Sequence, residues 1–153
     1  MSVIDKVRTV VQQMTDSPEF IGGSWFKLNQ EMEHVPLPCV MWVNPASGTF
    51  EAKAMQILNS PNCLIGFFAK TDFIGDFEDD TEALETTTRM AFEFISRCNS
   101  SGLFDQIKEA RYSVSFDRFD VNASGIVLEV TLKEKQGMNI CDYYYTSPTG
   151  TTL

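Results

Sequence analysis

The densest group of side chains able to do chemistry is an acidic stretch between residues 72 and 85. Its carboxylates are Asp72, Asp76, Glu78, Asp79, Asp80, Glu82 and Glu85. Calcium binds several converging carboxylate oxygens, which makes Asp76, Glu78, Asp79 and Asp80 the candidate metal ligands. Their spacing departs from the helix–loop–helix calcium pattern of alternating acids, a glycine and a distant glutamate. Acidic residues favoured at the start of a helix explain the stretch more simply, and we expect no metal or other cofactor.

The single histidine, His34, follows Glu31, Met32 and Glu33, where a carboxylate could make it an acid–base group. No second histidine and no recognisable nucleophile motif accompanies it in the sequence. An exposed loop histidine is therefore the better interpretation, and we expect no catalytic residues and no enzyme activity.

Thiol chemistry has equally little support. The four cysteines are widely spaced and include no C-x-x-C pair: Cys39, Cys63, Cys98 and Cys141. Three of them lie within apolar runs or on an apolar helix face. This pattern favours buried free thiols over a disulfide framework or a zinc site.

Length and composition predict one folded domain. The chain has 153 residues, of which 43% are hydrophobic and twelve are Phe, enough apolar content to build a core. We expect this domain to span residues 1–137, followed by a loosely ordered tail over residues 138–153. That tail carries three aromatic residues, Tyr143, Tyr144 and Tyr145, which it cannot bury alone and which are candidate interface residues.

Charge and hydropathy restrict the partners. A net charge of −9 and a pI near 4.5 oppose extended contact with phosphate backbones, so we expect no direct binding of nucleic acid. No apolar run approaches the length of a membrane span, and residues 1–6 lack the basic start of a signal peptide. We therefore expect a cytoplasmic protein with no membrane contact.

The first half of the chain predicts one helix and several strands. Apolar residues recur at helical spacing over residues 3–14. Residues 24–28 suggest a short strand, and the apolar runs 38–45 and 63–69 predict buried core strands. Residues 50–58 fit a helix or a hairpin strand, and the turn signals at residues 59–62 favour the strand.

The second half predicts a long helix and a hairpin. An amphipathic pattern over residues 82–98 places Leu84, Ala91 and Phe92 on one face, with Asp80 or Thr81 as the cap. Residues 99–102 end this helix, and a short helical turn follows near residues 103–107.

Alternating strands over residues 111–117 and 126–135 form the expected hairpin, with a bulge near residues 117–118 and a turn at residues 122–125. The turn residues Asn122 and Ser124 are further interface candidates. The fold class is therefore α+β, with a mostly antiparallel sheet of four or five strands and helices 3–14 and 82–98 on one face.

Several motifs form a recognisable set, and they lie in residues 38–43, 62–73, 101–104, 120–126 and 132–134. Together they resemble a family of small prophage proteins from Bacteroides-type gut bacteria, and the resemblance extends from residue 1 to about residue 141. The element order is similar to that of phage tail terminator, tail completion and head–tail joining proteins. This resemblance implies ring-like self-association, contacts with other tail or connector proteins, and a location in the cytoplasm during assembly and then in the virion.

Two classes of function therefore remain open. The first is a structural subunit of phage assembly, whose acidic loop at residues 72–80 could line a passage for DNA. The second is a small acidic binding or regulatory module that depends on calcium. Ring formation favours the first class, and a calcium-dependent rise in melting temperature of a monomer favours the second.

Overall fold

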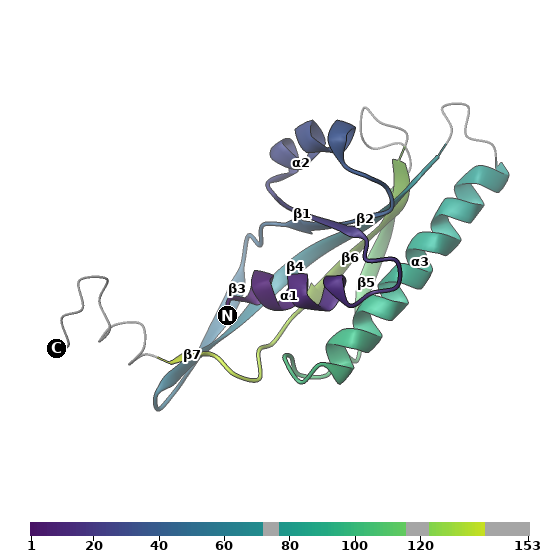
Figure 1. Ribbon diagram of the computed structural model, residues 1–153. Coiled ribbons are helices and arrows are strands. Elements are labelled where there is room, and N and C mark those ends of the chain that lie inside the picture. Colours follow the sequence, from purple (N-terminus) through teal and green to yellow (C-terminus); the bar gives the residue numbers. More distant parts are fainter. Residues whose placement is uncertain (72–76, 116–122, 140–153) are drawn as a thin grey trace.

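The computed structural model describes residues 1–71, 77–115 and 123–139, and its centre is a twisted sheet (Figure 1). Five strands run in the order β1-β2-β4-β6-β5. Their bounds are Glu19–Gly23 (β1), Cys39–Val43 (β2), Gln56–Lys70 (β4), Ala123–Thr131 (β6) and Arg111–Ser115 (β5). Among the described residues β1 and β2 pair in parallel and the other pairs are antiparallel. The predicted α+β class and mostly antiparallel sheet are confirmed, but the four or five strands predicted are too few, since β3 and β7 also pair with β4 and bring the described sheet to seven strands.

Strand β4 is the longest strand described and pairs with four others. Its 15 residues pair with β2 and β6 over the second half, while β3 (Gly48–Lys53) and β7 (Met138–Asn139) pair with the first half. The β3–β4 hairpin extends away from α2 (Trp25–Glu31) and α3 (Phe77–Ser100), at the lower left of Figure 1. We call this hairpin the arm.

The main core lies between the sheet and two helices, α1 (Val3–Gln12) and α3 (Phe77–Ser100). Phe67 of β4 and Phe94 of α3 are fully buried and meet edge to face with ring centroids 5.7 Å apart. Burying each such ring contributes about 1.5–3 kcal/mol. The two helices predicted for one face of the sheet are thus confirmed.

A second, smaller core covers the opposite face. There α2 (Trp25–Glu31) and the 3-10 helix η1 (Met32–His34) pack Leu28 and Met32 against Met41 and Phe68. The strand predicted over residues 24–28 is therefore wrong. The Ser24 hydroxyl accepts a hydrogen bond from the Lys27 amide and so caps the N-terminus of a helix. Leu28 is the buried residue of this helix.

The arm confirms the strand over residues 50–58 but moves its turn. The chain reverses at residues 54–55, and β4 then continues through residues 59–62, where we predicted the turn. Pro61 fits within a strand because its carbonyl still accepts a hydrogen bond from the Leu132 amide. Its backbone also lies so close to Gly48 that a side chain there would clash.

Helix α3 begins at Phe77, before the predicted cap at Asp80 or Thr81. It stops as predicted, since Gly102 adopts a left-handed φ of 74° just beyond it. The short helical turn predicted near residues 103–107 is wrong. Phe104 instead forms a β-bridge with Glu134, and the Asn99 side chain holds the backbone of Ile107 through two hydrogen bonds.

The last hairpin pairs β5 with β6 as predicted. Ile126, Leu128, Val130 and Leu132 are buried on the helix side, as the alternation requires. The predicted bulge at residues 117–118 lies outside the described residues. β7 reaches two residues past the domain boundary predicted at residue 137, and residues 140–153 lie outside the described part of the chain.

Candidate assembly interface

The described thiols are part of the core. Cys39, Cys63 and Cys98 are free and buried, as predicted, while Cys141 lies outside the described residues. Burial raises the pKa of all three thiols to about 12, with smaller contributions from neighbouring groups. They are protonated at neutral pH and are not placed to act as nucleophiles or metal ligands.

His34 is exposed at the end of η1, which confirms the exposed position predicted for it. No group of three His, Cys, Asp or Glu side chains with metal-binding geometry occurs in residues 1–71, 77–115 and 123–139. These ranges likewise contain no helix long and apolar enough to cross a membrane.

The acidic candidates fall at the start of α3. Glu78, Asp79 and Asp80 occupy its first turn, where negative charge is favourable, and Asp76 lies outside the described residues. Within the described part of the chain, one oxygen of Asp80, Oδ1, is buried and has no hydrogen-bond partner. Taken alone, this oxygen would supply one of the six to eight oxygen ligands that calcium takes.

The interface predicted at the last hairpin is wrong for Ser124. Strand β6 begins at Ala123, so Ser124 pairs with Ala69 and is fully buried. Gly125 serves close packing, because a side chain there would collide with the Phe67 carbonyl oxygen. Asn122, Tyr143, Tyr144 and Tyr145 lie outside the described residues.

The arm presents one exposed apolar surface. Ala52 lies opposite Ile57 in the hairpin, so Phe50, Ala52 and Ile57 point to the same face, with Met55 at the turn. Phe50 is 78% exposed, and Met55 and Ile57 are exposed as well. We call Phe50, Met55 and Ile57 the arm surface.

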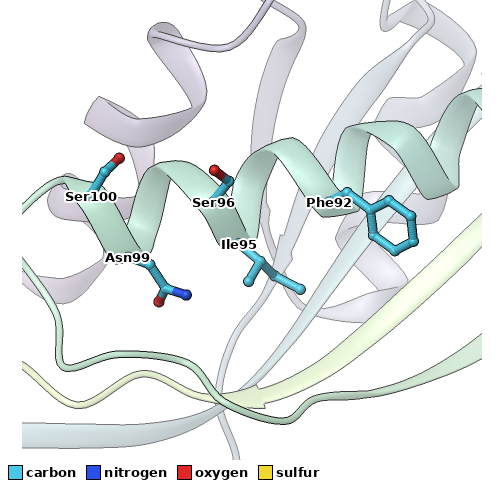
Figure 2. Close-up of a pocket in the computed structure, with 5 residues that line it drawn as sticks. All are labelled: Phe92, Ile95, Ser96, Asn99 and Ser100. Atoms are coloured by element: carbon cyan, nitrogen blue, oxygen red, sulfur yellow. The ribbon is translucent and has the colours of Figure 1, made fainter.

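A second set of exposed apolar residues lies on α3 and on the edge strand β5. Phe92, Ile95 and Asn99 follow at helical spacing and project from the same side of α3 (Figure 2), beside a shallow hollow of about 540 Å³. The Asn99 side chain forms hydrogen bonds with the backbone of Ile107, four residues before β5 begins. This side of α3 therefore faces the segment that leads into β5. Tyr112 and Val114 lie opposite Leu128 and Ile126, which places them on the same face of the sheet as α3.

We call Phe92, Ile95, Tyr112 and Val114 the α3–β5 surface. Phe92 is 68% exposed, which corrects its predicted position on the buried face of the helix. The core positions of α3 are Ala83, Thr87, Ala91, Phe94 and Cys98, so the buried face is turned toward Phe94. The spacing of Ala91, Phe94 and Cys98 was the sequence signal that could have revealed this.

A polar groove of about 510 Å³ adjoins the start of β5. Asn62 links its walls, donating to Ser47 Oγ at 3.0 Å and accepting from Thr131 Oγ1 at 2.8 Å. Arg111 and Glu129, opposite each other on β5 and β6, also line it. The described residues that line the groove include no histidine or cysteine, and what they offer is hydrogen bonding and charge.

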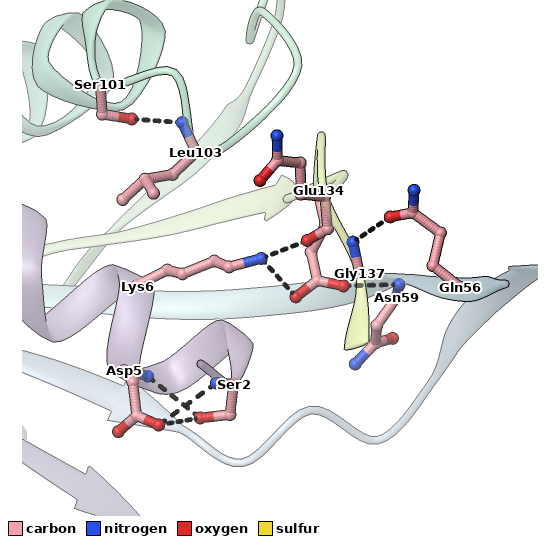
Figure 3. A network of polar contacts seen from close by, with 10 residues as sticks. Ser2, Asp5, Lys6, Gln56, Asn59, Ser101, Leu103, Glu134 and Gly137 are labelled. Carbon is pink, nitrogen blue, oxygen red and sulfur yellow. Dashed lines mark hydrogen bonds and ion pairs between the residues drawn. The ribbon is translucent and has the colours of Figure 1, made fainter. Parts of the chain in front are cut away.

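The base of the arm is fixed by a buried ion pair (Figure 3). Lys6 on α1 donates to Glu134 Oε1 at 2.8 Å and to the Gln136 carbonyl at 2.7 Å. Glu134 Oε2 accepts from the Asn59 amide of β4 at 2.9 Å. These bonds hold α1, the first half of β4 and the chain after β6 in one geometry.

Neither a protein-family model nor any curated protein matches this chain.

Proposed function

We propose that this protein is a structural subunit of phage assembly, of the tail terminator or head–tail joining type. It acts through ring-like self-association and through contacts with other tail or connector proteins. The observation that carries this proposal is the presence of two different exposed apolar surfaces, the arm surface and the α3–β5 surface, on one chain.

The two surfaces lie on opposite sides of β4. The chain after β6 continues along one edge of β4 through Leu132 and Glu134, which leaves β3 on the other edge, beside β2. The β5 part of the α3–β5 surface lies on the other side of β4, beyond β6, and its α3 part lies on a helix that packs over β4 and β6. A contact between two unlike surfaces is heterologous, and repeating it gives a closed ring or a helical filament.

Exposed aromatic residues support an interface rather than a catalytic surface. Isolated apolar residues are common on protein surfaces, whereas clusters of large ones mark interaction sites. Both surfaces hold an aromatic residue that is at least two-thirds exposed, Phe50 on the arm and Phe92 on α3. Aromatic residues are enriched among the residues that dominate binding energy.

The net charge of −9 suits a ring through which DNA passes, because an acidic lining repels phosphate and does not retain it. In this proposal the subunit assembles in the cytoplasm and stays in the virion. Partners are then other proteins, and DNA is not bound directly.

Deletion of the gene from the phage or prophage genome that carries it tests this function. Particles without the protein should show tails of uncontrolled length or heads separated from tails, seen by negative-stain microscopy. Supplying the wild-type protein should restore complete particles. Complete particles of normal length without the protein would refute the assembly role.

A calcium-dependent binding module is the second candidate. The buried, unpartnered Asp80 Oδ1 beside an acidic stretch is the observation that favours it. It predicts a monomer that is stabilised by calcium.

A further inference from the structure

Both strands that carry the exposed apolar residues are edges of the sheet. In the part of the chain that the structure describes, β3 pairs with β4 alone and β5 pairs with β6 alone. Each therefore keeps one row of backbone donors and acceptors available for a further strand. All six residues of β3 are exposed, as are the first four of the five residues of β5.

The two edges alternate in the same way. On β3, Phe50 and Ala52 point to one face and Glu51 and Lys53 to the other. On β5, Tyr112 and Val114 point to one face and Arg111 and Ser113 to the other. Placed side by side, the edges can match apolar with apolar side chains and charged with polar ones.

One antiparallel register also matches the charges. Setting Glu51 opposite Arg111 places Phe50 opposite Tyr112 and Thr49 opposite Ser113. The same register places Lys53 opposite Glu109, which is exposed just before β5. Each of these two pairs then joins one positive and one negative side chain. In a parallel pairing that keeps Glu51 opposite Arg111, Lys53 would instead lie opposite the uncharged Ser113.

We propose that β3 of one copy adds to β5 of the next copy as an antiparallel strand, with Glu51 opposite Arg111. This inference rests on the proposed ring-forming function and names the contact that builds the ring. Phe50 would then lie beside Tyr112 and Phe92, so the arm surface covers the α3–β5 surface of the neighbour.

The partner strand comes from another copy because the two edges are distant within one chain. Thr49 lies opposite Ser60 of β4, while Ser113 lies opposite Val127, which faces Gly66 of β4. Ser60 and Gly66 are six residues apart on β4, so the two edge positions are about 20 Å apart along the strand direction. Strands β4 and β6 also lie between β3 and β5. Pairing between β3 and β5 is thus intermolecular.

The charged side chains of the arm can form new ion pairs with a neighbouring copy. Glu51 lies 3.8 Å from Lys53 Nζ and 3.3 Å from Lys133 Nζ, in ion pairs whose side chains are about half exposed. Such pairs contribute little to stability and are easily replaced by a partner of similar charge. Arg111 has no ion pair within the described residues that would compete.

Disulfide trapping tests the register. In a Cys141→Ser background, the double variant Thr49→Cys/Ser113→Cys should form a ladder of linked chains under mild oxidation, since paired residues bring Cα atoms within disulfide range. The ladder should disappear on reduction. Thr49→Cys and Ser113→Cys alone are the matched controls and should remain single chains on a denaturing gel.

The outcomes separate this contact from the ring itself. A ring by light scattering without a ladder overturns the β3–β5 contact and leaves the assembly function intact. Linked dimers from a single-cysteine variant would mean that like edges pair, which also overturns it. A protein that is a single chain by light scattering and forms no ladder overturns both.

Charge reversal gives an independent readout. Glu51→Arg and Arg111→Glu should each shift the assembled protein toward single chains by at least about tenfold in concentration, because like charges face each other. The combined variant restores opposite charges and should recover assembly. Failure of the combined variant to recover, with each variant folded by circular dichroism, would contradict the register.

Discussion

Lys6 Nζ lies 2.8 Å from Glu134 Oε1, and both side chains are more than nine-tenths buried although 128 residues separate them. The pair joins the first helix to the last described segment at the base of the arm. Removing one partner of a buried ion pair leaves an uncompensated charge, which costs far more than losing an exposed pair. The geometry of the arm therefore depends on this contact.

Glu134→Ala should lower the free energy of unfolding by about 3–5 kcal/mol, because Lys6 loses its counterion and keeps only the Gln136 carbonyl, and the Asn59 amide loses its acceptor. Urea denaturation followed by circular dichroism measures the change. Lys133→Ala is the matched control, since Lys133 is the adjacent residue and its ion pairs are exposed, so it should cost at most about 1 kcal/mol. Equal losses would show that the buried pair has no special role.

Gly125→Ala should destabilise the protein by about 3 kcal/mol or more, because its methyl group would meet the Phe67 carbonyl oxygen between two central strands. Gly102→Ala provides the comparison. Gly102 has a left-handed φ and no atom close to the added methyl group, so the cost is conformational, about 1–2 kcal/mol. Urea midpoints rank the two variants, and a smaller loss for Gly125→Ala would refute the close packing of β4 and β6.

The three buried thiols predict a loss of stability at alkaline pH. Their pKa is about 12 in the folded chain against 9.0 for an ordinary thiol. Unfolding therefore releases protons above about pH 9, so the free energy of unfolding falls from about pH 9 to pH 12. Urea midpoints in a Cys141→Ser background measure this decline.

The matched variant for this decline is Cys63→Ala, which has one such thiol fewer and should decline less steeply than the background after correction for its own stability. At neutral pH the folded Cys141→Ser protein should also react with thiol reagents about a hundredfold more slowly than in urea, because reaction requires opening of the core. Rapid modification of the folded Cys141→Ser protein would contradict the buried positions.

Calcium should not stabilise the protein if assembly is its function. About 1 mM calcium or magnesium should each leave the melting temperature within about 1 °C, because one buried oxygen of Asp80 does not make a calcium site. A saturable rise of several degrees with calcium and not with magnesium would move the conclusion to the binding module.

Most of the core could be predicted from the sequence because its signals are local. The apolar spacing of α1 and the continuous apolar runs of β2 and the second half of β4 each fix an element within a few residues. The alternation of β5 and β6 predicted their hairpin, whereas the order of the other strands and the strand β1 were not predicted. Such signals depend on burial, which the residue types report directly.

The candidate interface was missed because exposed aromatic residues look like core residues in a sequence. Phe92 and Phe94 both fit an apolar helix face, and the rotation of α3 about its own axis decides which of them is buried. Gly125 was taken for a turn glycine, although it serves close packing between strands. Both depend on contacts with residues distant in the sequence.

The role of the two exposed surfaces in self-association can be tested by introducing one charged residue into each. Phe50→Asp and Phe92→Asp should each abolish self-association while leaving the urea midpoint nearly unchanged, since both rings are exposed. Phe26→Asp is the matched control, because Phe26 on α2 is 73% exposed and lies outside both surfaces. Loss of assembly by all three variants alike would indicate nonspecific hydrophobic association.

The most direct measurement is the mass of the wild-type protein by light scattering behind size exclusion, over a wide range of concentrations and with negative-stain images of the largest species. We expect a closed ring whose mass is a fixed multiple of 17.2 kDa. A mass of one chain at every concentration would contradict the proposed ring.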